Sequence, residues 1–598
     1  MADTIYLSFL ESAQKNPART ALMHKVGGAY QGTTYSELSR TVDQVAAGLA
    51  ARGVKPGDRV GIYSYNRPEW VVADLAIIKL GAVVVPIYHT LPADSVRYIL
   101  RDAEVGHLLV ENPELFSAVT SVMQDCPALK DVITLFLQPG ETRTGKELFS
   151  FESLRGKGAE ALAADPRASA AYPSRADDLM TIVYTSGTTG EPKGAMLTHA
   201  NILSNVHAAI PRFNIAPTDT LVSFLPLCHM LERTCGYYTL LMAGGCIAYA
   251  ESVQTIREDV AKVRPTIMIV VPRVLEKVYN AVAEKVTTGS ALSRFLMLAT
   301  LRTFSQYAQN KARGIPQPLR LRFKRWVLGL LVVRKLKALG GGRLRLLVSG
   351  GAPLDRKLAR IVRNLGFNLL EGYGLTETSP VVCTAIPGQE RVGTVGKPFP
   401  DVEVRIGPSD EVLIRGPNVM SGYLNKPEET AKAIDRDGWF HSGDQGRFDE
   451  EGNLIITGRI KEIIVNSYGK NIAPVPIELA IAGSTYVEQV VVVGDRQPYL
   501  TALMVPARLT LLEYCRQNGI PADDYAAVLH DKRVAELYRQ EIDNALKGLA
   551  GYEQVKRFRL IPEPFTVENG LLTPSLKVRR PLVTEAYKHD IAAMYKEV

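Results

Sequence analysis

The stretch that decides the fold of this chain is residues 184–194, which read YTSGTTGEPKG. It follows an apolar run at 179–184 that predicts a buried strand, and a helical pattern begins near Thr198. Its glycines let the backbone approach an anion closely, and consecutive N–H groups can form a phosphate-binding nest. Lys193 adds a cation. The spacing is not that of a Walker A loop, so the stretch predicts a different phosphate loop, or, taken alone, a glycine- and threonine-rich surface loop.

On both sides of this stretch, short apolar strands alternate with amphipathic helices. Strands are predicted at 59–63, 220–224, 266–271, 344–348 and 367–370, and helices at 35–52, 69–80, 253–263 and 353–365. This alternation indicates an α/β fold, with mostly parallel sheets covered by helices on both faces.

The pattern changes in the last third of the chain. Short alternating strands at 402–406 and 411–415 predict a small β-barrel-like unit, and a smaller α+β segment begins near residue 460 with a strand pair at 490–493 and 500–505. We therefore expect a large N-terminal domain at 1–459 and a small, mobile C-terminal domain at 460–598.

Composition and cysteine spacing exclude several classes of protein. The 598 residues are 46% hydrophobic and 22% charged, which is typical of soluble globular proteins and excludes disorder as the main state. The six cysteines form no C-x-x-C pair and no zinc-like spacing, so a disulfide framework is not expected and a reducing compartment fits better. The sequence also predicts no signal peptide and no membrane-spanning helix. We expect a cytoplasmic protein.

Five further motifs follow the glycine-rich stretch in a fixed order. They read SGGAP at 349–353, EGYGLTE at 371–377, GWFHSGD at 438–444, GRIKE at 458–462 and LTPSLK at 572–577. Together they resemble the adenylate-forming superfamily, which contains acyl-CoA synthetases, luciferases and the adenylation domains of peptide synthetases. The resemblance runs from about residue 34 to about residue 580.

The resemblance implies a nucleotide site and its cofactors, ATP and Mg²⁺. The implied nucleotide-binding residues are Thr185, Ser186, Gly187, Thr188, Thr189, Gly190, Lys193, Gly350, Gly351, Ala352, Glu371, Gly372, Tyr373, Gly374, Asp444 and Arg459. Within this set, 350–352 would form one wall of the adenine pocket, Tyr373 would stack on the base, and Asp444 would accept hydrogen bonds from the ribose.

The same resemblance implies residues for the chemistry. Thr376 would contact the α-phosphate, and Glu377 with Thr185 would bind Mg²⁺, a cation that needs few protein carboxylates when it shares phosphate oxygens. Lys577 would stabilise the transition state of adenylation, and Lys461 would be the hinge of the C-terminal domain. The implied reaction forms an acyl-adenylate and pyrophosphate, after which the thiol of coenzyme A attacks the acyl carbon and AMP leaves.

The segment FLPLCHMLERT at 224–234 indicates which acid is activated. Its P-L-x-H-x-x-E-R-T form resembles long-chain fatty acyl-CoA synthetases, in which His229 lies beside the acyl group. We see no carrier-domain segment after Lys577, which argues against an integrated peptide synthetase. Two alternatives stay open: a fatty acyl-AMP ligase that delivers to a carrier protein, and a non-catalytic acyl- or nucleotide-binding membrane protein.

One window of the chain is strongly basic. Between Glu284 and Asp355 there is no acidic residue, and the cations there outweigh the net charge of +8 of the whole chain. These cations are Lys285, Arg294, Arg302, Lys311, Arg313, Arg320, Arg322, Lys324, Arg325, Arg334, Lys335, Lys337, Arg343 and Arg345. Apolar residues such as Trp326 lie among them. We expect the insertion at about 285–345 to contact an anionic membrane peripherally, on the inner face of the cytoplasmic membrane. A solvated basic face is the alternative, and nucleic acid is not expected because no binding motif accompanies the charge.

Overall fold

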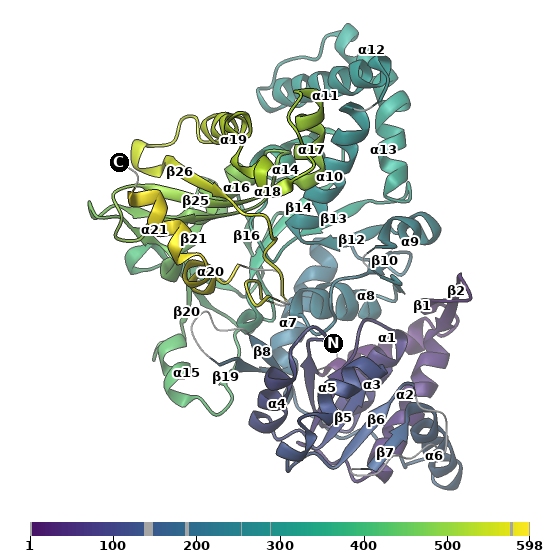
Figure 1. Ribbon diagram of the computed structural model, residues 1–598. Helices are drawn as coiled ribbons and strands as arrows, with labels where there is room; N and C mark the ends of the chain where they lie inside the picture. Colours follow the sequence, from purple (N-terminus) through teal and green to yellow (C-terminus); the bar gives the residue numbers. More distant parts are fainter. Residues whose placement is uncertain are drawn as a thin grey trace. The chain divides into compact units, whose positions relative to one another are not determined.

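The chain folds into two compact units in the computed structural model, which describes residues 3–136, 147–185, 191–252, 254–287, 289–567, 569–573 and 578–596 (Figure 1). The first unit comprises Met1–Val404, Leu413–His441 and Gly452–Leu454, and the second comprises Arg405–Val412, Ser442–Glu451 and Ile455–Val598. The predicted domain boundary at 459/460 stays a prediction.

An eight-stranded sheet in the first unit has the order β19-β9-β8-β4-β3-β5-β6-β7. Its strands are β3 (Arg59–Tyr63), β4 (Val83–Ile87), β5 (His107–Val110), β6 (Asp131–Thr134), β7 (Glu147–Ser150), β8 (Leu179–Thr185), β9 (Lys193–Thr198) and β19 (Gly422–Tyr423). The strands from β8 to β7 are parallel, whereas β9 pairs antiparallel with both β8 and β19. All five residues of β4 are buried, as expected for a parallel strand with both faces covered.

The chain changes direction in the middle of this sheet. From β3 it passes through α3 (Pro68–Lys79) to β4 on one side, and from β4 it passes through α4 (Ala93–Asp102) to β5 on the other side. Because such crossovers are right-handed, α3 and α4 cover opposite faces. The carboxyl ends of β3 and β4 therefore border the kind of crevice in which α/β proteins bind ligands.

A second sheet has nine strands in the order β16-β15-β14-β13-β12-β10-β11-β1-β2. Its strands are β1 (Thr20–Val26), β2 (Ala29–Thr34), β10 (Thr220–Ser223), β11 (Cys246–Tyr249), β12 (Ile267–Val270), β13 (Leu346–Ser349), β14 (Leu369–Gly374), β15 (Val381–Thr384) and β16 (Lys397–Pro398). The strands from β14 to β1 are parallel. At one end of the sheet β2 pairs antiparallel with β1, and at the other end β15 pairs antiparallel with both β14 and β16. The predicted α/β fold with mostly parallel sheets is confirmed.

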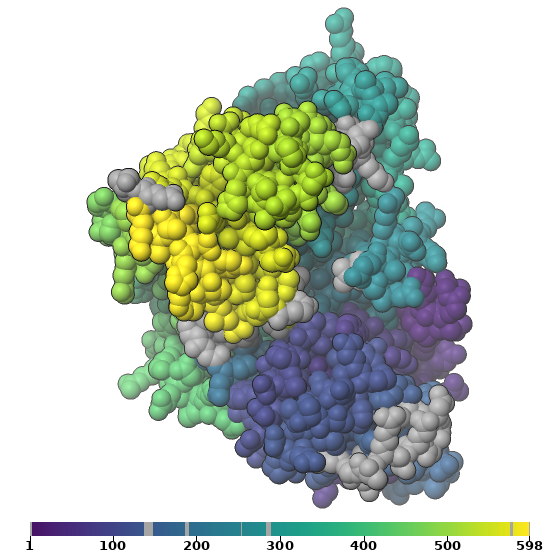
Figure 2. Space-filling view, viewed as in Figure 1, coloured from purple at the N-terminus to yellow at the C-terminus, as the bar shows by residue number. Residues whose placement is uncertain are grey.

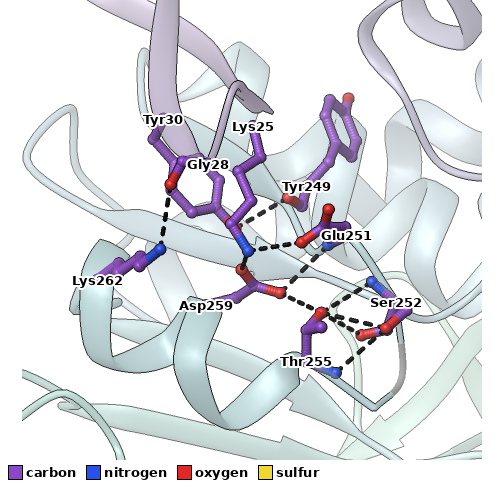
Figure 3. A network of polar contacts seen from close by, with 9 residues as sticks. All are labelled: Lys25, Gly28, Tyr30, Tyr249, Glu251, Ser252, Thr255, Asp259 and Lys262. Carbon is purple, nitrogen blue, oxygen red and sulfur yellow. Dashed lines mark hydrogen bonds and ion pairs between the residues drawn. The ribbon is translucent and has the colours of Figure 1, made fainter.

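A polar network fixes the β1–β2 hairpin to helix α9 (Ile256–Val263) (Figure 3). The ammonium group of Lys25 lies 2.6 Å from a carboxylate oxygen of Glu251 and 3.2 Å from one of Asp259. Asp259 also accepts a hydrogen bond from Thr255, at 2.7 Å. Because Asp259 is buried, pairing with Lys25 offsets the cost of removing its charge from water.

The basic window forms a helical excursion between β12 and β13. It contains α10 (Pro272–Thr287), α11 (Ala291–Ala312), α12 (Leu319–Leu328), a π-helical turn η3 (Gly329–Val333) and α13 (Arg334–Leu339). Its atoms, teal in Figure 2, form part of the molecular surface. Among the described helices of the chain, none is long and apolar enough to cross a membrane.

The second unit is a smaller α+β body with its own core. A three-stranded sheet of β24 (Val487–Val493), β25 (Leu500–Pro506) and β26 (Val555–Leu560) packs against α16 (Pro474–Ala482) and α19 (Lys532–Ala545). The predicted strand pair is confirmed as antiparallel β24–β25. A four-stranded sheet, β17-β18-β20-β21, contributes residues to both units; its strands are β17 (Glu403–Ile406), β18 (Glu411–Arg415), β20 (Phe440–Phe448) and β21 (Leu454–Arg459).

Candidate active site

Two of the predicted nucleotide-binding segments lie at the same edge of the nine-stranded sheet. Strands β13 and β14 are parallel neighbours in which Ser349 pairs with Glu371. The segments 350–352 and 372–374 therefore leave adjacent strands side by side, where open α/β sheets bind ligands. Gly374 admits no side chain, because a Cβ atom there would lie 1.7 Å from the carbonyl oxygen of Pro380.

Glu371 occupies a buried position at this edge. One of its carboxylate oxygens lies 3.2 Å from the Arg363 guanidinium group. Burial raises the pKa of the Glu371 carboxyl to about 7 although Arg363 opposes the shift. Near neutral pH this carboxyl therefore exchanges between its charged and neutral forms.

The structure brings together two residues that the sequence predicts on the phosphate side, Lys193 and Glu377. Tyr423 lies between them: its hydroxyl donates a 2.9 Å hydrogen bond to Oε1 of Glu377, and the Lys193 ammonium group lies 5.1 Å from the centre of its ring. Lys193 also forms an ion pair with Glu429 of α15 (Pro427–Ala433). That pair and a second one with Lys432 lower the pKa of the Glu429 carboxyl to about 2.

A magnesium ion that accompanies a nucleotide needs only one or two protein carboxylates. Among the residues that the structure describes, no three His, Cys, Asp or Glu side chains gather in a way that could hold a metal. Glu377 lies in a short 3₁₀ turn, η4 (Thr376–Thr378), directly after Thr376. Because Mg²⁺ retains several waters and shares phosphate oxygens, one Glu oxygen suits it better than a protein cage would.

Other predicted residues lie in the second unit. The Nε atom of Arg459 donates a 2.7 Å hydrogen bond to Oδ1 of Asp444, so the two predicted ribose contacts pair with each other. Asp444 is buried, on β20, and Arg459 ends β21. Lys461, the predicted hinge, is exposed in the next turn, η6 (Ile460–Glu462).

Part of the predicted site lies outside the described residues. This holds for Ser186, Gly187, Thr188, Thr189, Gly190 and Lys577. The ends of the glycine-rich stretch are described: Thr185 pairs with Lys193 in an antiparallel β8–β9 ladder. The predicted helix start near Thr198 is confirmed, since Thr198 caps α7 (His199–Arg212), whereas the strand β9 that precedes this helix was not predicted. The short run KGAMLT gives no clear helical period, and its strand form depends on pairing with β8 and β19.

His229 lies where the carboxyl ends of both large sheets meet. Its loop follows β10, and its ring lies 6.3 Å from the ring of Tyr88, edge to face, in the segment after β4. Asn66, in the segment after β3, fixes this loop: its amide accepts from the Leu227 N–H at 2.9 Å and donates to the Leu225 carbonyl at 2.6 Å. The predicted acyl-side histidine therefore borders the crevice between β3 and β4.

The segment after His229 forms an unusual helix that is fixed by a buried ion pair. The π-helix η2 (Leu231–Tyr238) places Arg233 against Asp74 of α3, with both side chains fully buried. The hydroxyl groups of Tyr237 and Tyr238 donate to the same carboxylate, at 3.0 and 2.8 Å. A buried charge pair with this many hydrogen bonds holds a helix in one position.

Sequence reasoning missed several residues that hold this site. The missed residues are far in sequence from the groups that they contact. The separation is 46 residues for Tyr423 and Glu377, 159 for Asp74 and Arg233, 161 for Asn66 and Leu227, and 236 for Glu429 and Lys193. Only weak signals pointed to them: an unpaired-looking Asp inside the apolar helix 68–79, and an Asn in a turn before Pro68. Their partners become visible only in the fold.

Comparison with known proteins identifies the family. Residues 9–424 match the AMP-binding enzyme family, and residues 461–598 match the AMP-binding enzyme C-terminal domain. The chain is 35% identical to the long-chain-fatty-acid–CoA ligase FadD15 of Mycobacterium bovis, over all of this chain and 97% of that protein. It is 32% identical to the human long-chain-fatty-acid–CoA ligase 1, over all of this chain and 87% of that protein.

Solved structures agree on the fold. The adenylation domain of a carboxylate reductase from Mycobacterium chelonae has a TM-score of 0.79 at 24% identity, covering 99% of this chain and 91% of that domain. ATP-bound MatB from Rhodopseudomonas palustris has a TM-score of 0.71 at 25% identity, covering 98% of this chain and 99% of MatB. The chain therefore belongs to the AMP-binding enzyme family, among its AMP-forming long-chain acyl-CoA synthetases.

Proposed function

We infer that the protein activates a long-chain fatty acid with ATP and transfers the acyl group to coenzyme A. The fatty acid carboxylate attacks the α-phosphorus of ATP, which gives an acyl-adenylate and pyrophosphate. The thiol of coenzyme A then attacks the acyl carbon, and AMP leaves. The observation that carries this function is the likeness along the whole chain to long-chain-fatty-acid–CoA ligases.

We propose roles for the site residues on the same basis. Lys193 and Thr376 contact phosphates, Glu377 with Thr185 binds the Mg²⁺ that accompanies ATP, and Asp444 with Arg459 holds the ribose. Lys193 contacts the ring of Tyr423 and Glu377 accepts a hydrogen bond from its hydroxyl, which supports a common phosphate side for Lys193 and Glu377. Bound Mg²⁺ would supply positive charge to the transferring phosphate. His229, which borders the crevice between β3 and β4, would lie beside the acyl chain.

A chain-length series tests this function. AMP release is measured with acids of two to about twenty carbons, with and without coenzyme A. Coenzyme A-dependent release that is greatest with long acids is the expected result. If pyrophosphate is released but the reaction stops at the acyl-adenylate even with coenzyme A present, the result would instead favour an acyl-AMP ligase that delivers to a carrier protein. No pyrophosphate release with any acid would favour a non-catalytic binding protein.

We further propose that helix α12 contacts an anionic membrane surface. Leu319, Phe323, Trp326 and Leu330 follow one helical stripe at a spacing of i, i+4, i+7 and i+11, and their exposed fractions are 78%, 65%, 62% and 47%. Such a run of exposed apolar side chains is unusual on a surface that contacts only water. The exposed cations Arg320, Arg322 and Lys324 lie on the same helix. An apolar stripe flanked by cations complements an anionic lipid surface, such as the inner face of the cytoplasmic membrane.

Several cations of the basic window have partners within the protein, among them Lys337, which lies 6.0 Å from the ring centre of Phe367. The Arg325 guanidinium lies 4.2 Å from the ring centre of Tyr307 and 5.1 Å from that of Phe304, which fixes α12 to α11. Arg345 forms an ion pair with the buried Asp219. These contacts assign Arg325 and Arg345 to the fold, and the proposed membrane surface is therefore narrower than the basic window as a whole.

A further inference from the structure

Tyr423 connects the two charged groups of the phosphate side. Its hydroxyl donates to the Glu377 carboxylate at 2.9 Å, and its ring face lies under the Lys193 ammonium group, 5.1 Å from the ring centre. The side chain is 9% exposed. One aromatic residue thus contacts an anion through its hydroxyl and a cation through its ring.

Hydrogen bonds hold the backbone around Tyr423 to β9 and to the turn that carries Glu377. Tyr423 pairs with Ala195 of β9, and the next N–H, that of Leu424, donates to the Gly194 carbonyl at 2.8 Å. The Met420 N–H donates to the carbonyl oxygen of Glu377 itself, at 2.9 Å. The ring therefore keeps its place between the turn that carries Glu377 and the strand that carries Lys193.

The fixed Tyr423 hydroxyl restricts the orientation of the Glu377 carboxylate to which a metal ion would bind. A glutamate side chain has several rotamers, and a metal ligand that must first be ordered binds more weakly. The hydrogen bond occupies Oε1 and holds the carboxylate in one orientation, while a single metal contact needs only the other oxygen. Groups that orient metal ligands in this way typically contribute 10- to 100-fold to metal affinity or activity.

We propose that Tyr423 is a positioning residue that pre-orients Glu377 for the divalent cation of the nucleotide and holds Lys193 beside it. This inference rests on the proposed function, because it takes Glu377 as the magnesium ligand. It adds a specific claim: the tyrosine hydroxyl acts on the metal through Glu377, and the tyrosine ring acts on the phosphates through Lys193.

The test separates the hydroxyl from the ring. In Tyr423→Phe the ring under Lys193 remains and only the hydrogen bond to Glu377 is lost. Binding of Mn²⁺ with ATP is measured on the full chain, without fatty acid, by calorimetry and by the spin resonance signal of bound Mn²⁺. We expect the Mn²⁺ concentration at half-saturation to rise about tenfold, with the KM for fatty acid unchanged. Tyr30→Phe is the matched control, since it removes a tyrosine hydroxyl that bonds the Tyr249 carbonyl at 3.1 Å, in a different part of the first unit.

Glu377→Gln separates failure of this inference from failure of the proposed function. If Glu377→Gln leaves Mn²⁺ binding unchanged, Glu377 is not the metal ligand, and this inference fails together with the proposed role of Glu377; the chain-length series decides the proposed function itself. If Glu377→Gln weakens Mn²⁺ binding and Tyr423→Phe does not, the positioning role alone is overturned. A Tyr423→Phe variant that loses affinity for every substrate alike, with a lowered melting temperature, would also overturn it, because that pattern indicates a purely structural tyrosine.

Discussion

At the scale of single residues, burial raises the carboxyl pKa of two glutamates, and the sequence around them does not predict this shift. Glu371 and Glu232 are both buried, and burial raises the pKa of the Glu232 carboxyl to about 8. Oε1 of Glu232 has no hydrogen-bond partner among the residues that the structure describes. Ionised Glu232 would be a buried charge, so the folded protein favours its neutral form.

Glu232→Gln should stabilise the protein at alkaline pH. With its pKa raised on folding, the wild-type carboxyl binds its proton more tightly in the folded state, so the wild type loses stability as pH rises from about 4.5 towards 8. Glutamine keeps the shape and does not ionise. We expect the melting temperature of the variant to exceed that of the wild type by a few degrees at pH 8.5, with the gain vanishing near pH 4.5. A difference that is the same at both pH values would show that Glu232 is not neutral in the fold.

Lys577→Ala should abolish adenylate formation and spare the second half-reaction. A lysine that contacts the transferring phosphate acts mainly in the transition state, and its loss should slow adenylation roughly a hundredfold or more, equivalent to about 3 kcal/mol. Pyrophosphate release reports the first step, and thioester formation from supplied acyl-adenylate reports the second. Equal loss of both would mark Lys577 as a structural residue.

At this scale, sequence motifs predicted the candidate chemical residues but not the residues that contact them. The order of motifs pointed to Lys193, Glu377 and His229 because these residues lie in compact, recognisable segments. Tyr423 and Asn66 contact them across 46 and 161 residues of chain, in the Tyr423–Glu377 and Asn66–Leu227 hydrogen bonds. Partners at such separations follow from strand order and pairing, which local periodicity does not determine.

At the scale of elements, helix α12 has two faces with different partners. Leu321 and Leu328 are buried and Arg325 stacks on α11, whereas Leu319, Phe323 and Trp326 point to solvent. The rings of Phe323 and Trp326 lie 6.0 Å apart, so they form one apolar surface. The sequence predicted a basic insertion with apolar residues among its cations, but only the packing distinguishes Arg325 from its exposed neighbours.

Replacing the exposed cations of α12 should weaken vesicle binding. Arg320→Gln, Arg322→Gln and Lys324→Gln together remove three charges, each contributing about 1 kcal/mol near an anionic surface, so partitioning should fall more than a hundredfold. Binding should also weaken with salt, as the Debye length shortens from about 10 Å at 0.1 M to about 3 Å at 1 M. Co-sedimentation with vesicles containing phosphatidylserine measures both effects.

The matched control also removes three positive charges, but from residues outside the basic window. Lys15→Gln, Arg496→Gln and Arg516→Gln replace three exposed cations outside the basic window. The control should bind vesicles as the wild type does, and both variants should keep their activity on a short, water-soluble acid. Equal binding by the α12 variant and the wild type would leave the solvated basic face as the better account.

Several buried strands were predicted well, although the fully buried strands β5 and β6 were not predicted. The strand at 59–63 matches β3 at both ends, and those near 179–184, 220–224 and 266–271 match within one residue at each end. The edge strands β16 and β19, and β9 next to β19, were missed, because their short sequences have no continuous apolar run and their form depends on pairing. The antiparallel edges of both sheets were missed for the same reason.

At the scale of the whole molecule, the predicted site residues are divided between two units. Lys193, Glu377 and His229 belong to the first, and Asp444, Arg459 and Lys461 belong to the second. An enzyme with two half-reactions can use such a division to present different residues to the same substrate in turn. The predicted hinge at Lys461 is the point at which this can be tested.

Lys461→Pro should impair thioester formation more than adenylate formation. Proline fixes φ near −65° and removes a backbone N–H, which restricts rotation at the hinge. Lys461→Ala removes the same side chain without restricting the backbone and should retain both half-reactions. Single-turnover measurements of pyrophosphate release and thioester formation distinguish the steps. A proline variant with normal thioester formation would exclude Lys461 as the hinge.

The ion pair between Lys193 and Glu429 has a consequence for turnover. If Lys193 contacts a phosphate as proposed, that phosphate would replace the Glu429 carboxylate at the ammonium group, so nucleotide binding would exchange one anion for another. Because Glu429 is part of the same chain, it competes as a tethered ligand whose effective concentration does not depend on the concentration of the enzyme. In the proposed site, pyrophosphate bound at Lys193 would meet the same carboxylate as a competitor. The proposed role of Lys193 therefore implies that Glu429 would favour release of the first product.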